Sequence, residues 1–205
     1  MALFGRESRA ERRGSPIQFL VVGLGNPGRE YARTRHNVGE ETIAVLAQRC
    51  GATLRLGRDK ALIAEVTLAG QRCVLAFPTT FMNESGQAVG ALARRFAVTE
   101  PAQIIVVHDE LDLPPGVVRV KVGGGLAGNN GLRSITHHLK TQDYLRVRIG
   151  IGKPPSKEQG ANHVLSRLPK AEREALDVSV EIAADAVETI VGQDPDAAMR
   201  DFNSR

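Results

Sequence analysis

Ile104-Ile-Val-Val-His108-Asp109-Glu110-Leu-Asp112 joins four β-branched residues to a histidine and three carboxylates. A short apolar run with polar residues directly after it predicts a buried strand that ends in ionisable side chains. In open α/β sheets, functional groups gather beyond the carboxyl ends of the strands. The segment therefore predicts an α/β fold with a functional site near Asp109.

The rest of the chain alternates predicted strands and helices around this segment. Strand patterns also occur at residues 19–22, 62–68, 72–77, 117–122 and 144–149, and helical patterns at residues 40–50, 87–96 and 169–191. Ala69-Gly70 predicts a hairpin turn between the second and third strands. Buried strands that alternate with helices, interrupted by one hairpin, indicate a single-domain three-layer α/β/α sandwich around a mixed, mostly parallel central sheet.

Length and composition set the limits of this domain. The chain has 205 residues, of which 42% are hydrophobic, and this suits one domain over residues 16–205. Residues 1–15 are mostly polar and charged, and we expect them to form a disordered extension. No apolar run approaches the roughly 18 residues that a membrane-spanning helix requires. Because Cys50 and Cys73 stand outside any C-x-x-C pattern, we expect a protein of the reducing cytoplasm.

Charge is distributed unevenly along the sequence. Residues 113–155 contain seven Lys or Arg and one Asp, a local net charge of +6, whereas residues 171–205 contain three Arg and nine acidic residues, a local net charge of −6. This asymmetry predicts a basic surface suited to a polyanion and an acidic surface turned away from it. The alternative is that these charged residues simply lie on solvent-exposed faces of an ordinary domain, which would give the same local net charges.

The segment from Gly23 to Gly28 formally matches the dinucleotide-binding pattern G-x-G-x-x-G. A dinucleotide site requires these glycines to open a helix. Asn-Pro-Gly instead favours a turn, and Pro27 disfavours a helical conformation at Asn26. We therefore interpret the segment as a rigid loop that directs Asn26 and His36 toward one place, and we reject the nucleotide-dependent enzyme that the pattern would indicate.

His36 and a carboxylate at the end of the strand at residues 104–107 form a candidate catalytic pair. An Asp bonded to one imidazole nitrogen fixes the tautomer and raises the basicity of the other nitrogen, which can then take a proton from water. Without such a partner, a histidine in this polar stretch would be an ordinary surface residue. A metal site at His108 and the neighbouring carboxylates is disfavoured, because alternate residues of a strand point to opposite faces.

Two loops after strands offer further polar groups. The segment from Pro78 to Gly86 runs from a strand into a helix and can expose the amide of Asn83, unless Asn83 or Ser85 simply caps that helix. The segment from Gly123 to Gly131 suits a mobile loop whose glycines let a phosphate or ribose approach the backbone. A flexible linker is the alternative there, although basic residues flank the loop on both sides.

From about residue 19 to the C-terminus, the sequence resembles the bacterial-type peptidyl-tRNA hydrolases. The resemblance implies a monomeric α/β hydrolase that cleaves the ester between a peptide and the 3′-terminal ribose of tRNA, and so recycles tRNA from stalled translation. It implies no metal or organic cofactor. Five blocks in the same order carry it: Val22 to Gly28 with Tyr31 and Thr34 to Asn37, Pro78 to Asn83, His108 to Gly116, Gly123 to Leu132, and Arg146 to Gly152.

The resemblance also implies roles for individual residues. His36 corresponds to the catalytic base and Asp109 to the carboxylate that orients it, so that an activated water cleaves the ester and no nucleophilic serine is required. Phosphate, ribose and peptide-backbone contacts would make the peptide sequence matter little. The other implied residues are Asn26 and Asn83, which position water and peptide, Tyr31 and Met82 near the scissile ester, Asn130 in the mobile loop, and Lys121 and Arg148, which hold the 5′ phosphate of the tRNA.

Gly128-Asn129-Asn130-Gly131 departs from the family's usual Gly-His-Asn-Gly, and Leu126 stands where a small or polar residue is commoner. Asn129 can donate and accept hydrogen bonds but cannot carry a proton. We therefore expect altered behaviour of this loop with activity retained. A non-catalytic RNA-binding homologue of the same fold is the alternative function.

Overall fold

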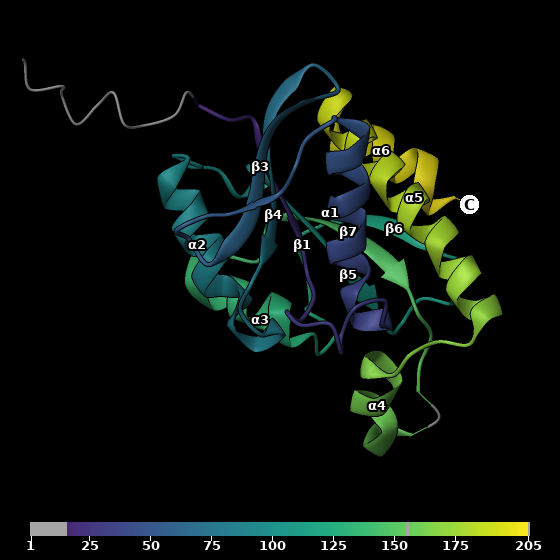
Figure 1. Ribbon diagram of the computed structural model, residues 1–205. Helices are drawn as coiled ribbons and strands as arrows, with labels where there is room; N and C mark the ends of the chain where they lie inside the picture. Colours follow the sequence, from purple (N-terminus) through teal and green to yellow (C-terminus); the bar gives the residue numbers. More distant parts are fainter. Residues whose placement is uncertain (1–15, 155, 205) are drawn as a thin grey trace, which may run out of the picture.

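The structure of the protein, a computed structural model, is built on one seven-stranded sheet with strand order β2-β3-β4-β1-β5-β7-β6 (Figure 1). It describes residues 16–154 and 156–204, so the predicted extension at residues 1–15 lies outside the described residues. The strands are β1 (Phe19–Gly23), β2 (Arg55–Leu56), β3 (Ala61–Leu68), β4 (Gln71–Pro78), β5 (Ile104–Glu110), β6 (Val118–Val122) and β7 (Leu145–Gly150).

The sheet is mixed and mostly parallel, as predicted. Strands β4, β1, β5 and β7 are neighbours that run in the same direction, and β3 and β6 run against them. The predicted hairpin joins β3 to β4, where Leu68 pairs with Gln71 across a two-residue loop. Ala69 and Gly70 in this loop both have positive φ, 45° and 81°. Two positive φ angles are the signature of the type I′ turn that two-residue hairpins prefer.

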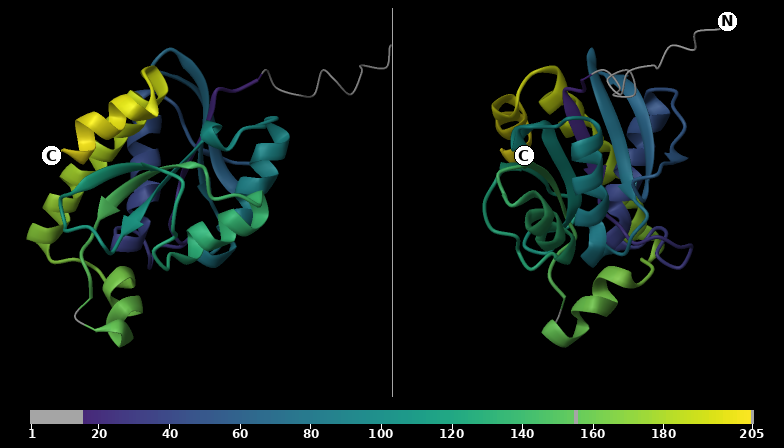
Figure 2. Two further views of the ribbon diagram at one scale, coloured as in Figure 1. Left: turned by 180° about the vertical axis from the view of Figure 1, so that it is seen from behind. Right: turned by 90° about the vertical axis from the view of Figure 1, so that its left-hand side faces the viewer.

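Helices cover both faces of the sheet. Helices α2 and α3 pack on one face and α1 and α5 on the other, while α6 lies along the β6 edge (Figures 1 and 2). This confirms the three-layer sandwich. The bounds are α1 (Val38–Arg49), α2 (Ser85–Arg95), α3 (Asn130–Leu139), α4 (Gly160–Leu165), α5 (Lys170–Gly192) and α6 (Pro195–Asn203), with 3₁₀ turns η1 (Arg35–Asn37), η2 (Met82–Glu84), η3 (Pro101–Gln103) and η4 (Lys157–Gln159).

The central strand β1 shows how the two layers share the sheet. Val21 belongs to the core under α1 and α5, whereas Leu20 and Val22 belong to the core under α2 and α3. A strand buried on both faces must be apolar throughout. At the end of β1 the helix α1 packs directly on the backbone, because a Cβ added to Gly39 would lie 2.3 Å from the carbonyl oxygen of Val107. This contact fixes the start of α1, and with it His36, beside the ends of β1 and β5.

Strand β5 extends three residues beyond its predicted end at Val107 and includes His108, Asp109 and Glu110. All three polar residues are buried, and the pairing with β7 continues to Glu110 opposite Gly150. Strand β2 and helices α4 and α6 were not predicted from the sequence. Both views of Figure 2 show α4 projecting beyond the carboxyl ends of the strands.

The β6 edge of the sheet is closed by a side chain. The backbone N–H of Val120 donates to Oδ1 of Asn203 at 2.8 Å, and Nδ2 of Asn203 donates to the carbonyl of Val120 at 2.9 Å. The side-chain amide of Asn203 therefore makes the two hydrogen bonds that a neighbouring strand would make with the centre of β6. Among the described residues, no helix is both long and apolar enough to cross a membrane.

The acidic C-terminal region is largely paired within the fold. Arg49 of α1 contacts three carboxylates of α5, those of Glu181, Asp185 and Glu188, at 2.6–3.2 Å. Arg33 likewise contacts Asp177 at 2.9 Å. The local net charge of −6 therefore overstates the free acidic surface, because arginines from the N-terminal half lie against it.

Candidate active site

His36 and Asp109 meet where β1 and β5 end. Nδ1 of His36 lies 2.9 Å from Oδ2 of Asp109, and the two side chains are 15% and 3% exposed. Burial lowers the pKa of His36, but the charge of Asp109 and its hydrogen bond raise it, and the net effect is a pKa above the ordinary value. Because Asp109 engages Nδ1, Nε2 is the nitrogen left to exchange a proton.

A cleft of about 520 Å³ opens over this pair. Helix α4, which the sequence analysis missed, contributes Val164 and Leu165 to its wall. Tyr31 does not line the cleft itself but meets the edge of Phe81, a lining residue, with ring centroids 6.3 Å apart. Six of the predicted site residues line the cleft: Asn26, His36, Met82, Asn83, Asp109 and Asn130.

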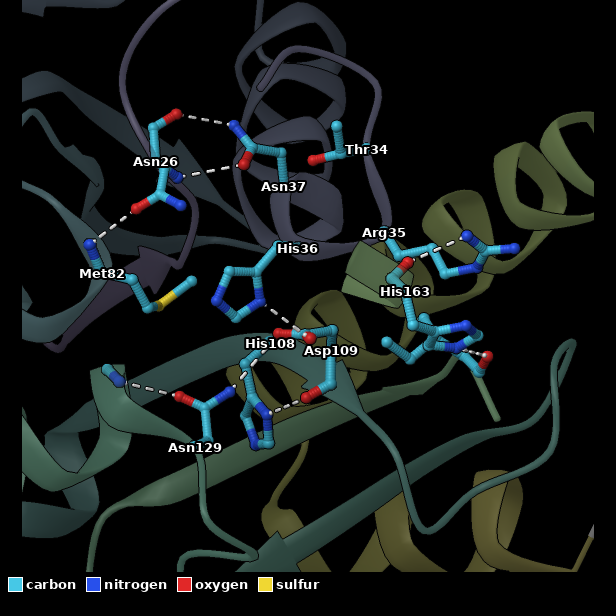
Figure 3. Close-up of polar contacts among 12 residues, drawn as sticks. Asn26, Thr34, Arg35, His36, Asn37, Met82, His108, Asp109, Asn129 and His163 are labelled. Atoms are coloured by element: carbon cyan, nitrogen blue, oxygen red, sulfur yellow. Dashed lines mark hydrogen bonds and ion pairs between the residues drawn. The ribbon is translucent and has the colours of Figure 1, made fainter. Parts of the chain in front are cut away.

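Asn26 is held in one orientation by two neighbours (Figure 3). Its backbone N–H donates to Oδ1 of Asn37 at 3.0 Å, and Nδ2 of Asn37 donates back to its carbonyl at 2.9 Å. Its own Oδ1 accepts from the backbone N–H of Met82 at 2.8 Å. With that oxygen engaged, the side chain has Nδ2 left as a donor. The loop after β1 is thus a rigid support for an amide donor, and its glycines open no helix.

Asn129, at the position that departs from the family pattern, contacts Asp109 directly. Its Oδ1 accepts from the backbone N–H groups of Gly131 and Leu132 at 2.9 and 3.1 Å, which makes it the N-cap of α3. Its Nδ2 donates to Oδ1 of Asp109 at 3.4 Å. Each carboxylate oxygen of Asp109 therefore has its own partner, His36 or Asn129. The departure at Asn129 is visible in the sequence, but its contact with Asp109 was not predicted.

The capping role considered for Asn83 and Ser85 is wrong. Helix α2 begins at Ser85 without a side-chain cap, and Oγ of Ser85 donates to the carbonyl of Met82 at 2.8 Å. Asn83 is exposed and borders the cleft. The start of α3 packs closely here, since a Cβ added to Gly131 would lie 2.5 Å from Sδ of Met82.

Comparison with known proteins gives this geometry its context. The family model described as peptidyl-tRNA hydrolase matches residues 20–205. The chain belongs to the peptidyl-tRNA hydrolase family. The peptidyl-tRNA hydrolase of Frankia alni is 53% identical over 84% of this chain and 87% of that protein, and that of Nocardia farcinica is 51% identical over 90% and 95%. The crystal structure of peptidyl-tRNA hydrolase from Acinetobacter baumannii, 40% identical, superposes with a TM-score of 0.87 over 93% of this chain and 98% of that one.

The resemblance found in the sequence is therefore confirmed, and with it membership of an enzyme family. In this peptidyl-tRNA hydrolase family member, Lys121 lies opposite Arg146, and Arg119 opposite Arg148, in the β6–β7 pairing. Cross-strand partners and alternate residues point to one face of a sheet. The four basic side chains therefore share a face, which is the face that carries α2 and α3.

The two β7 arginines have different surroundings. Nε of Arg148 donates to Oε2 of Glu110 at 3.0 Å, and Glu110 borders the cleft. Arg146 is 2% exposed, and its guanidinium donates to the backbone carbonyls of Gly123, Gly124 and Gly125. The donors of Arg146 therefore already hold the start of the glycine loop.

His108 belongs to the strand interior rather than to the cleft. Its ring is 1% exposed, and Nδ1 lies 2.7 Å from the carbonyl oxygen of Asp109. Burial lowers the pKa of His108 and so favours the neutral ring. Within the described residues, no three His, Cys, Asp or Glu side chains come together in a way that could hold a metal ion.

Proposed function

We propose that this protein hydrolyses the ester that joins a peptide, or an N-blocked aminoacyl group, to the 3′-terminal ribose of tRNA, and so recycles tRNA from stalled or aborted translation. The contact between His36 and Asp109 in the cleft carries the proposal, because ester hydrolysis by water needs a positioned base. The relatives named peptidyl-tRNA hydrolase support the choice of substrate.

In this mechanism Nε2 of His36 takes a proton from a water molecule while the water oxygen attacks the ester carbonyl carbon. Asp109 keeps the imidazole in the required tautomer and stabilises the imidazolium that forms. The proton then passes to the ribose oxygen as its bond to the carbonyl carbon breaks. The products are a peptide with a free carboxyl group and a tRNA with an intact terminal ribose.

Amide groups stabilise the charge that develops on the carbonyl oxygen. Nδ2 of Asn26 is the donor best fixed for this role, because Met82 N–H holds the other end of the amide. Asn130, at the start of α3, and Asn83, on η2, position the peptide on the same side of the cleft. Met82 and Tyr31 supply the apolar surroundings of the ester.

The RNA lies against the face of β6 and β7 beside the cleft. Lys121 and Arg148 bind the 5′ phosphate of the acceptor end, and such contacts weaken as salt concentration rises. The proposed active form is a monomer. Its place of action is the cytoplasm, where translation takes place. The mechanism uses water and side chains and needs no cofactor.

The decisive experiment measures release of N-acetyl-aminoacyl groups from tRNA by the purified protein, with His36→Ala beside it and unblocked aminoacyl-tRNA as the second substrate. We expect hydrolysis of the blocked ester by the wild type and its loss in the variant. Equal release by both proteins would refute the mechanism. Binding of tRNA without release by either protein would identify a non-catalytic RNA-binding homologue.

A further inference from the structure

A second hollow adjoins the cleft on the α3 side. It measures about 310 Å³ and is lined by Asn83, Asn130, Arg133, Ser134, His137 and His138. We call it the α3 hollow, because five of these six residues lie on that helix. Asn83 and Asn130 line the cleft as well. The two hollows therefore meet at this pair of amides.

The α3 hollow is rich in hydrogen-bond donors and contains no carboxylate. Arg133 is exposed, and Nη1 donates to Oδ1 of Asn130 at 3.2 Å. Among the described residues, Arg133 forms no ion pair. The imidazoles of His137 and His138 meet edge to face with ring centroids 5.5 Å apart, and Nδ1 of His138 lies 2.8 Å from the carbonyl of Ser134. A ligand group that fits this lining is an anion.

The position of the α3 hollow indicates which part of the substrate, the peptide or the RNA, would reach it. Arg148 and Glu110 border Asp109 on the β7 side, where the proposed function binds the tRNA phosphate. Asn83 and Asn130 border the cleft toward α3, and Figure 1 shows α3 and α4 on opposite sides of the strand ends. A substrate whose ester lies at His36 and whose RNA extends toward β7 can send its peptide toward α3 or along α4, and the polar lining of the α3 hollow favours the first direction.

We propose that the α3 hollow is a peptide subsite that favours an acidic side chain one or two residues before the esterified residue. This proposal rests on the proposed function, because the ester at His36 sets the direction of the peptide. Arg133 provides the charge, in a fork geometry that matches a carboxylate. An exposed ion pair of this kind contributes little, so we expect a preference of about two- to fivefold. The subsite thus adds a modest side-chain preference to recognition that otherwise depends on the backbone.

Three substrates with one tRNA and one esterified residue test the subsite. Each carries an N-acetylated peptide with Glu, Gln or Lys at the two preceding positions, and kcat/KM is measured for each. We expect the wild type to prefer Glu over Gln by about two- to fivefold, and Gln over Lys, with smaller differences at high salt. Arg133→Gln should make the three substrates equal.

Lys140→Gln is the matched control. It removes the same charge from the C-cap position of the same helix, outside the α3 hollow. We expect this variant to keep the wild-type preference. If it loses the preference as Arg133→Gln does, the effect comes from the general field of α3, and the subsite is refuted.

Other outcomes show whether the subsite alone fails or the proposed function fails with it. Equal kcat/KM for the Glu and Gln substrates in an active wild type would refute the subsite alone. A uniform loss of tRNA affinity in Arg133→Gln, with the preference unchanged, would assign Arg133 to RNA and also refute it. A wild type that releases none of the three peptides would overturn the proposed function and the subsite with it.

Discussion

Arg148 is tethered by a buried carboxylate, because its Nε donates to Oε2 of Glu110 at 3.0 Å while the two side chains are 20% and 4% exposed. Oε1 of Glu110 accepts from the backbone N–H of Asp112 at 3.1 Å, so the carboxylate itself is fixed. Among the described residues, the Nη atoms of Arg148 have no hydrogen-bond partner. Because Nε is held by Glu110, the guanidinium has a fixed orientation in which its Nη donors can bind a phosphate.

We predict that Arg148→Ala has two separable effects. It should reduce the slope of log affinity for tRNA against log salt by about one, because one phosphate contact is lost. It should also lower the free energy of unfolding by roughly 1–3 kcal/mol, because Glu110 is left as an unpaired buried acid. Salt titrations of binding and thermal unfolding measure the two effects.

Adding Glu110→Gln to Arg148→Ala serves as the control. The double variant should recover most of the lost stability, since the remaining buried group is then neutral, but none of the lost salt dependence. Recovery of tRNA binding in the double variant would contradict a direct contact between Arg148 and phosphate.

Asp109→Asn should move the acid limb of the pH profile of kcat/KM to lower pH. The Asp109 charge and hydrogen bond raise the pKa of His36, and the general base acts only when neutral. Removing the charge lowers that pKa, so His36 stays deprotonated at lower pH. The rate should nevertheless fall by about 10²- to 10⁴-fold, because the tautomer is no longer fixed. A full pH–rate series on one blocked aminoacyl-tRNA checks both effects, and an unmoved acid limb would count against the pair.

Asn129 variants should separate the cap of α3 from the contact with Asp109. Asn129→Asp keeps a capping oxygen but sets a second negative charge beside Asp109, which should raise the pKa of His36 and move the acid limb to higher pH. Asn129→Ala loses the cap and should cost about 1 kcal/mol of stability. If both variants keep the wild-type pH profile, the 3.4 Å contact has no effect on the catalytic pair.

Arg146→Met should loosen the start of the glycine loop. Three carbonyls, those of Gly123, Gly124 and Gly125, lose a charged donor, and each such bond contributes about 1.5–3 kcal/mol. Hydrogen exchange in residues 123–129 should accelerate by on the order of tenfold or more, with kcat/KM reduced. Lys121→Met, which removes a charge from the neighbouring strand, is the comparison. Equal exchange in the two variants would argue against Arg146 as the anchor.

The strands could be predicted because their residues alternate between two apolar layers or lie wholly in the core. The end of β5 could not, because burial of Asp109 and Glu110 depends on partners far away in sequence, His36 and Arg148. Helix α6 carried a readable signal that was overlooked. Asp194 caps it, and Pro195 stands at its first position.

The end of the strand at residues 104–107 predicted a carboxylate partner for His36, and the resemblance singled out Asp109. The structure places Nδ1 of His36 2.9 Å from Oδ2 of Asp109. The resemblance assigned Lys121 and Arg148 to the phosphate and gave no role to Arg146, although Arg146 and Arg148 are both basic residues of β7. They are two residues apart on one strand and share a face, but one lies under the glycine loop and the other beside Glu110. The local sequence does not show which of the two arginines contacts the glycine loop and which contacts Glu110. The contact between Asn129 and Asp109 could not be predicted for the same reason, because it joins residues that lie apart in the sequence.

The amide of Asn203 on β6 also bears on how molecules behave toward one another in concentrated solution. An open strand edge offers its unpaired backbone groups to any other chain. Asn203 occupies both the backbone N–H and the carbonyl of Val120, at the middle of the edge strand β6. Among the described residues, α6 packs along this strand. Removing the last helical turn should therefore show itself first as turbidity and sedimenting material, at temperatures where the cleft is still intact.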